Sequence, residues 1–158
     1  MKYRSAWAGL VGCFLLAGPA WAGSDVEAIE KAILAETKSA ATFAETRNKR
    51  AVLALYAPDY SGIQDGETET LDSIERWLAD YEAELSRGST LWFLGTVSNL
   101  QIQAVGSTAW ATYDYVFQAM RKGELEGQDT GKCTSLLRKE SSAWLIFHEH
   151  CSKLRPLQ

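Results

Sequence analysis

The feature that most constrains the fold is a predicted β-hairpin near the C-terminus. Two strand-like segments, residues 132–139 and 143–152, are joined by a short polar connection. Successive residues of a strand point to opposite faces, and a strand exposed on one face alternates apolar with polar residues. The second segment is apolar at both parities, starting with Trp144 on one face and Leu145 on the other. We therefore expect this strand to be covered on both faces.

The N-terminus has the composition of a secretory signal peptide. Lys2 and Arg4 form a basic start, residues 6–18 are mainly apolar, and Ala20-Trp21-Ala22 has the small-x-small pattern of a cleavage site. We predict cleavage after Ala22 and export to the periplasm or the medium. A lipid-modified Cys13 and an uncleaved anchor remain as alternatives.

The predicted mature chain, residues 23–158, has a length suited to one domain. The sequence carries 16 basic and 20 acidic residues, and the leader removes two of the basic ones. This acidic balance argues against nucleic acid and anionic membranes as partners. After the leader, no apolar stretch approaches the roughly 20 residues of a transmembrane helix.

The order of predicted elements indicates an α+β fold. Apolar residues recur at helical spacing early in the chain, beginning with a capping-box pattern at Ser24 and Glu27. Alternating strands follow, and glycines between 123 and 131 indicate a loop or a bulge. The predicted helices cover about 25–45, 51–56 and 72–86, and the strands cover 60–65, 91–103, 109–120 and the terminal hairpin. Helices followed by antiparallel strands predict helices packed on one face of a curved sheet.

The other face of this sheet needs a cover too. Because no residues are left over for that purpose, we predict a second copy of the chain there, forming a homodimer. Its contact surface includes Trp110, Trp144 and Ile146, with His148 as a further candidate.

Two cysteines remain after the leader, which are too few for a zinc site. Export favours a disulfide between Cys133 and Cys151. If Lys139 faces Ala143, however, the cysteines are diagonal neighbours about 7–8 Å apart, beyond the usual limit of about 7 Å. A one-residue bulge near Gly131 would bring them opposite each other. A disulfide and two free packing thiols are both open at this point.

The motif Trp144-x-Ile146-x-His148-Glu149-His150-x-Ser152 resembles the last strand of SnoaL-like domains. These belong to the nuclear-transport-factor-2-like (NTF2-like) superfamily, and the closest branch includes the calcium/calmodulin-dependent kinase association domain. Residues 55–60 resemble that family's junction between helix and first strand, so the resemblance covers about 25–153. It implies a cone-shaped fold with a pocket at the wide end, and dimers through the outer sheet face. Members include isomerases, cyclases, dehydratases and non-catalytic proteins.

The resemblance to the kinase association domain also implies pocket residues on the last strand, namely Phe147, Glu149 and Cys151. Ser135 and Cys151 stand where that domain has arginines, which argues against a pocket for carboxylate ligands. Aromatic residues elsewhere could stack on a flat apolar ligand, or could be ordinary core. These are Tyr56, Trp77, Tyr113, Tyr115 and Phe117.

Three residues are candidates for acid–base chemistry. His148 and His150 could form a catalytic pair or an anion clamp, or could be bonded within the sheet or at the dimer interface. Asp65 lies close to the position of the catalytic carboxylate in steroid-isomerase-like members, but it also fits a polar turn before Gly66.

We therefore predict an exported, dimeric, non-catalytic domain that binds a small apolar or aromatic ligand or interacts with a partner, without cofactor or metal. One alternative is an isomerase or cyclase with an acidic or histidine base in an apolar pocket. Another is an oligomerisation module for a partner protein.

Overall fold

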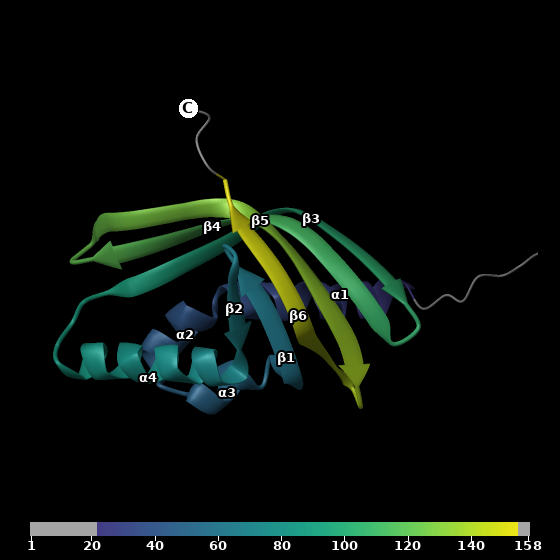
Figure 1. Cartoon of the computed structure of the whole chain (residues 1–158), viewed down its shortest axis with the longest axis horizontal. Helices are drawn as coiled ribbons and strands as arrows, with labels where there is room; N and C mark the ends of the chain where they lie inside the picture. The colour runs from purple at the N-terminus through teal and green to yellow at the C-terminus, as the bar shows by residue number, and fades with distance from the viewer. Residues whose placement is uncertain (1–21, 155–158) are drawn as a thin grey trace, which may run out of the picture.

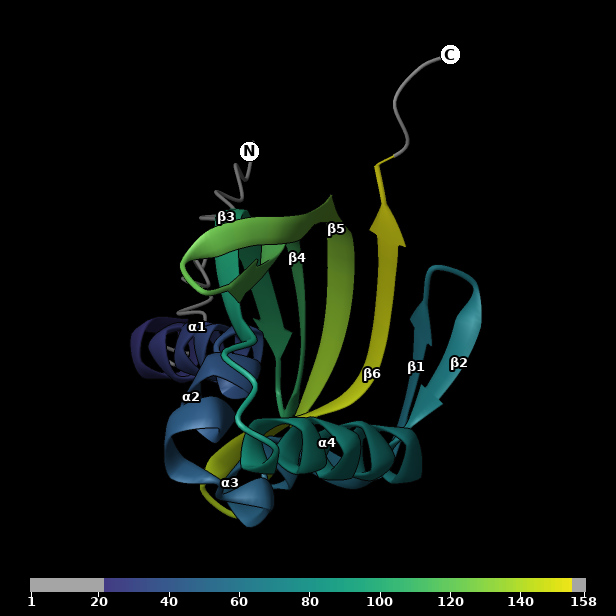
Figure 2. The same ribbon diagram turned by 90° about the vertical axis from the view of Figure 1, so that its left-hand side faces the viewer.

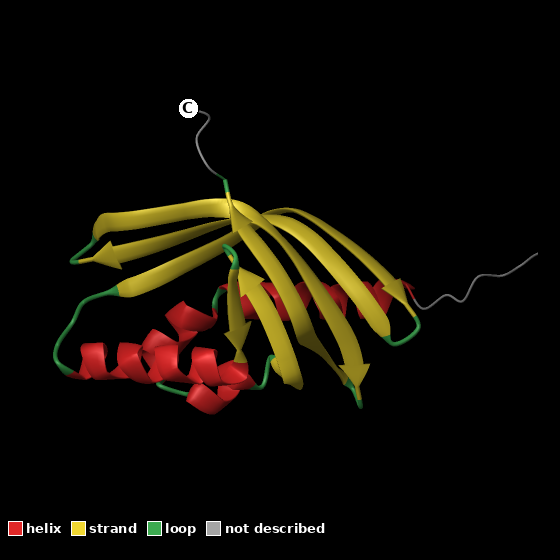
Figure 3. Ribbon diagram, viewed as in Figure 1, coloured by secondary structure: helices red, strands yellow, loops and turns green. Residues whose placement is uncertain are grey.

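The computed structural model describes residues 22–154, in which helices gather beneath one face of a curved sheet (Figures 1 and 3). Residues 1–21 of the predicted signal peptide lie outside these residues. None of the helices in the described part is long and apolar enough to cross a membrane. The elements are α1 (Ala22–Thr37), α2 (Ser39–Thr46), α3 (Lys49–Leu53), β1 (Tyr56–Gln64), β2 (Glu67–Thr70), α4 (Leu71–Ser86), β3 (Trp92–Val105), β4 (Thr108–Arg121), β5 (Glu124–Glu140) and β6 (Ala143–Lys153).

The six strands form one mixed sheet in the order β2-β1-β6-β5-β4-β3. All neighbours are antiparallel except β1 and β6, which run parallel. The sheet bends strongly, and the helices lie against its concave side (Figure 2). The α+β class and the curved sheet predicted from the sequence are thus confirmed.

Several predicted boundaries are wrong. The helix expected over 25–45 is two helices, α1 and α2, and α1 begins at Ala22, so that Ser24 lies in its first turn. Of the loop or bulge expected between Gly123 and Gly131, the structure has a bulge: the 17-residue β5 runs through this stretch, and its pairing with β4 shifts register between Ala119 and Met120. Gly131 is required there by packing, because a Cβ atom would lie 2.3 Å from the Ser152 carbonyl oxygen.

The core lies between the helices and the concave face of the sheet. From the helices, Ile29, Ile33, Phe43 and Leu78 are fully buried against sheet residues such as Leu137. Each large apolar side chain removed from water stabilises the fold by roughly 1.5–3 kcal/mol. The predicted helix over 72–86 is confirmed as α4. A capping box starts this helix: the Thr70 side chain accepts a hydrogen bond from the Ser73 backbone N–H, and the Ser73 side chain accepts one from the Thr70 backbone N–H.

A β-bulge interrupts the alternation of side chains along β6. Leu137 pairs with Ile146 and Leu136 pairs with His148, so Phe147 is an extra residue between two registers. Side chains before and after the bulge therefore reach the same concave face despite opposite parity.

The bulge overturns part of the predicted dimer surface. Trp144 is 5% exposed and Ile146 is fully buried, and both belong to the core. The expectation that they lie on the outer face was wrong, since it assumed an unbroken strand.

The bulge also brings the two cysteines together. The hairpin turn places Glu140 opposite Ala143, so the register assumed from the sequence was wrong by one residue. The bulge lies at Phe147 rather than near Gly131, and the two shifts set Cys133 directly opposite Cys151. The cysteines form a disulfide with a sequence separation of 18. A closed loop of this length stabilises the fold by about 3 kcal/mol in the chain-entropy model.

Candidate functional site

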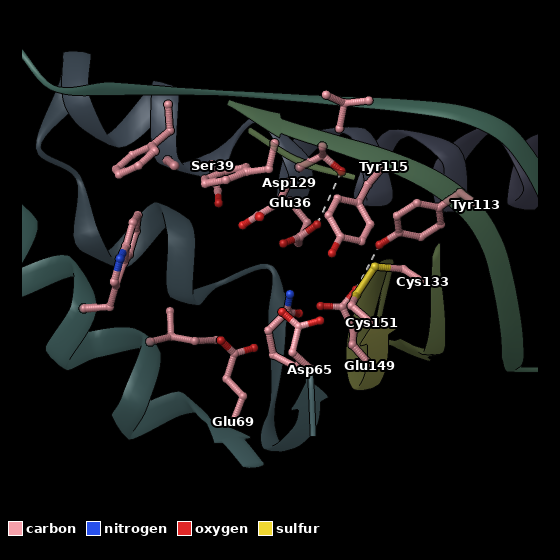
Figure 4. A pocket seen from close by; sticks show the side chains of 18 of the residues that line it. Glu36, Ser39, Asp65, Glu69, Tyr113, Tyr115, Asp129, Cys133, Glu149 and Cys151 are labelled. Carbon is pink, nitrogen blue, oxygen red and sulfur yellow. Dashed lines mark hydrogen bonds between the residues drawn. A yellow bond between two sulfur atoms is a disulfide. The ribbon is translucent and has the colours of Figure 1, made fainter. Parts of the chain in front are cut away.

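A cavity of about 410 Å³ lies between α1, α2, α4 and the concave face of the sheet (Figure 4). One wall contains the disulfide between Cys133 and Cys151. Its aromatic lining consists of Tyr56, Trp77, Phe93, Tyr113, Tyr115 and Phe117. Its acidic lining consists of Glu36, Asp65, Glu69, Asp129 and Glu149.

Glu149 on β6 is the most buried of these acidic residues, at 7% exposed. One carboxylate oxygen, Oε1, accepts hydrogen bonds from the Ser135 hydroxyl and, at 3.2 Å, from the Tyr113 hydroxyl. The other, Oε2, lies 3.5 Å from the Tyr60 hydroxyl. The bulge at Phe147 is what turns this side chain into the cavity.

Two further carboxylates come from other elements. Glu36, in the last turn of α1, accepts a hydrogen bond of 3.2 Å from the Tyr56 hydroxyl. Glu69 on β2 accepts one of 2.7 Å from Tyr60, the residue that also reaches Glu149. None of the three carboxylates forms an ion pair with any side chain in residues 22–154.

Burial and the closeness of these carboxylates raise the pKa values of Glu149 and Glu36. Burial raises the pKa of Glu149 to about 7, and the charge of Glu69 adds to the rise. Hydrogen bonds from Ser135, Tyr113 and Tyr60 oppose it. Burial, followed by the charge of Glu149, raises the pKa of Glu36 well above its usual range. Glu149 can therefore release or accept a proton near neutral pH.

The phenols around these carboxylates remain protonated donors. Burial is the main cause that raises the pKa of Tyr56, Tyr60 and Tyr113, and the neighbouring carboxylates raise it further. The cavity thus combines ionisable acceptors with fixed hydroxyl donors.

Three other charged residues that line the cavity, Lys153, Asp65 and Asp129, form ion pairs with one another. The Lys153 ammonium lies 3.2 Å from a carboxylate oxygen of Asp65 and 3.1 Å from one of Asp129. Asp65 also accepts a hydrogen bond from the Lys153 backbone N–H, and it adopts a positive φ before Gly66. Asp65 therefore acts as a turn residue at the rim, with its carboxylate already engaged.

Most of the predicted pocket residues line the cavity. They are Tyr56, Trp77, Tyr113, Tyr115, Phe117, Glu149 and Cys151. Phe147 does not line it; its ring instead lies 5.7 Å from the Arg138 guanidinium.

The two histidines are not among the lining residues either. A ring nitrogen of His148 lies 3.2 Å from the Ser61 hydroxyl oxygen, and His150 is exposed. The structure therefore does not bring these candidates together with Glu149, and the simplest interpretation is that they are bonded within the sheet.

Sequence reasoning missed Glu36 and Glu69. A signal for Glu36 was present, because Ile29, Ile33, Glu36 and Ala40 follow the three- and four-residue spacing of a buried helix face. A carboxylate in such an apolar stripe marks a buried polar site. Glu69 lies in a four-residue strand without an apolar pattern, and nothing in the sequence distinguished it.

Comparisons with known proteins agree with this geometry. A family model described as SnoaL-like domain matches residues 26–156. No curated protein sequence matches the chain. Among solved structures, an NTF2-like protein with a cystatin-like fold from Novosphingobium aromaticivorans has a TM-score of 0.65 at 16% identity, covering 85% of this chain and 84% of that one.

Two other similar structures have provisional names. A calcium/calmodulin-dependent protein kinase II association domain from Xanthomonas campestris has a TM-score of 0.59 at 20% identity, covering 84% of this chain and 88% of its own. A scytalone dehydratase from Novosphingobium aromaticivorans has a TM-score of 0.66 at 13% identity, with coverages of 84% and 85%. At these identities the likeness confirms the cone-shaped fold alone.

The raised pKa of Glu149 predicts that the protein loses stability as pH rises. The folded state holds the proton up to about pH 7, whereas an unfolded glutamate releases it near 4.5. The bound proton therefore adds to the free energy of unfolding. This stabilisation is fully present below about pH 4.5, and about 3 kcal/mol of it is lost as the pH rises to about 7. Glu149→Gln should remove this part of the slope in urea unfolding measured from pH 4.5 to 8. The exposed Glu27→Gln is the control, and unchanged slopes in Glu149→Gln would contradict the assignment.

Proposed function

The chain belongs to the SnoaL-like domain family, and from this premise we propose that it binds a small organic molecule in its cavity. The cavity itself carries the proposal, since about 410 Å³ with aromatic walls and a few polar groups is typical of small-molecule sites. The Tyr115 hydroxyl supports it further. This oxygen is buried on the cavity wall without a hydrogen-bond partner among the described residues, although buried polar groups are normally paired.

Proton transfer to or from the bound molecule is a second candidate function, favoured by Glu149. A general acid or base works best when its pKa lies near the operating pH, and the pKa of Glu149 is about 7. The Tyr115 hydroxyl lines the same cavity and has no hydrogen-bond partner among the described residues, so it could donate a hydrogen bond to an oxyanion that forms on the substrate. Isomerisation and cyclisation both fit this arrangement. Service as an oligomerisation module alone would not require unpaired carboxylates in a cavity.

We further propose that the protein is exported after cleavage behind Ala22 and acts as a dimer. The disulfide supports export, because such bonds persist in oxidising compartments. On the convex side, Trp110 pairs with Leu136 across β4 and β5, and Phe147 lies next to them at the bulge. This convex cluster, formed by Trp110, Leu136 and Phe147, retains Trp110 of the contact surface expected from the sequence and leaves out the buried Trp144 and Ile146.

Ligand binding predicts that filling the cavity abolishes the capture of small aromatic molecules. Ser39→Trp would place an indole in the cavity lining, while Ser98→Trp adds one on the exposed surface of β3. Neutral, cationic and anionic aromatic fragments are tested by ligand-observed NMR. We expect fragments that bind the wild type to bind Ser98→Trp and not Ser39→Trp. Equal binding by both variants would place the site elsewhere.

The catalytic candidate predicts that the protein accelerates deuterium exchange next to the carbonyl of 2-tetralone in D₂O. Glu149→Gln should lower this rate by about 10²-fold or more, the usual contribution of a general base. The wild-type rate should rise with pH up to about 7, as Glu149 loses its proton. Glu27→Gln serves as the control. A rate that is the same in Glu149→Gln and in the wild type would rule out Glu149 as the base.

Native mass spectrometry of the exported protein tests its maturation and assembly in one sample. We expect a protomer that begins at Gly23 and assembles as a dimer, and Trp110→Lys should weaken the dimer by placing a charge in the convex cluster. A protomer that retains its leader or carries a lipid at Cys13 would refute the export proposal. A monomer at micromolar concentration would refute the dimer.

A further inference from the structure

We propose that the cavity takes an organic cation, meaning a molecule with a protonated amine on a small apolar body. This inference rests on the proposed binding function and specifies its class of ligand. It follows from the charge of the lining, the aromatic walls and the unpaired hydroxyl of Tyr115.

The lining is strongly acidic. It contains five carboxylates and one cationic side chain, Lys153, which is already paired with two of the carboxylates at the rim. The other three, Glu36, Glu69 and Glu149, accept hydrogen bonds from tyrosine hydroxyls but have no cationic partner in residues 22–154. Glu36 and Glu69 are half-buried, whereas Glu149 is buried, and buried carboxylates are normally paired with a cation or coordinate a metal. No group of three such side chains in the described part is placed to hold a metal ion, so an organic cation suits the site better.

Tyr115 is a second, independent sign of an occupant. Its side chain is 9% exposed, lines the cavity, and points inward (Figure 4). Its hydroxyl has no partner within hydrogen-bond distance in residues 22–154; burial raises the pKa of this phenol, and the nearby Gln64 side chain only partly offsets that rise. An ammonium group offers three N–H donors and no acceptor, so it could donate to this oxygen and to nearby carboxylates together.

The aromatic walls suit the rest of such a molecule. Phe93 stacks on Phe117 with ring centroids 5.2 Å apart, and Trp77 lies 5.7 Å from Phe93. Ring faces attract cations and also bury apolar groups. The amine would thus lie toward the carboxylates and the apolar body would lie against these rings.

The groups facing Glu149 fix the expected pH dependence. They are the hydroxyls of Ser135, Tyr60 and Tyr113, with the carboxylates of Glu36 and Glu69 nearby, and none is cationic. A bound cation favours the ionised carboxylates, so binding should release protons and become tighter as pH rises through about 7.

Three probes of nearly equal shape separate charge from size: 2-phenylethylamine, 2-phenylethanol and phenylacetate. Calorimetry with the exported full chain at pH 8 should show the amine binding at least about tenfold more tightly than the alcohol, as expected for charge-assisted hydrogen bonds. Phenylacetate should bind most weakly. Amine affinity should rise between pH 6 and 8, where the amine stays protonated.

Matched variants locate the effect. Glu36→Gln and Glu149→Gln should each weaken amine binding about tenfold and leave the alcohol unchanged, while Glu27→Gln on the exposed side of α1 should change neither. Binding of the alcohol or the acid as tight as that of the amine would overturn the cation inference. If these three probes fail but other fragments bind in the Ser39→Trp comparison, this inference alone falls. If no fragment binds at all, the proposed function falls with it.

Discussion

One extra residue in β6 determines how the whole site is built. The bulge at Phe147 lets Trp144 and Ile146 pack in the core and then turns Glu149 and Cys151 toward the same concave face. Without it, the second half of the strand would send these two side chains to the convex side. The orientation of the buried carboxylate and the pairing of the two cysteines both depend on this change of register.

The site is costly in electrostatic terms, and the surrounding fold offsets that cost. Glu36 lies near the C-terminal end of α1, where the helix dipole disfavours a negative charge, and it shares the cavity with Glu149. Hydroxyls from Tyr56, Tyr60 and Tyr113 satisfy the carboxylate oxygens without neutralising them. The helix–sheet core and the disulfide therefore have to hold the site together against repulsion among its own acids.

The sequence predicted the parts of this arrangement that depend on periodicity. The apolar stripe of α4, the long strands and the helix-before-strand order follow from side-chain spacing, and they led to the correct fold. The bulge could not be predicted, since an extra residue in a strand of uniformly high β-propensity leaves no local mark. The wrong faces for Trp144 and Ile146 and the misplacement of Phe147 followed from it, while the register error at Cys133 came from the bulge together with the one-residue shift at the hairpin turn.

The acid at position 36 is not needed for the fold, but it suits a bound cation. A core with no further role would place an apolar residue where Glu36 stands, because that position belongs to the buried face that includes Ile33 and Ala40. The chain instead keeps an acid there and opposes it with Glu149 across an open cavity. Near neutral pH the raised pKa values of Glu149 and Glu36 limit this repulsion, because protonated carboxyls carry no charge. A cation that displaces those protons would relieve the repulsion by direct charge pairing, so the same group of acids would favour cationic ligands over neutral or anionic ones.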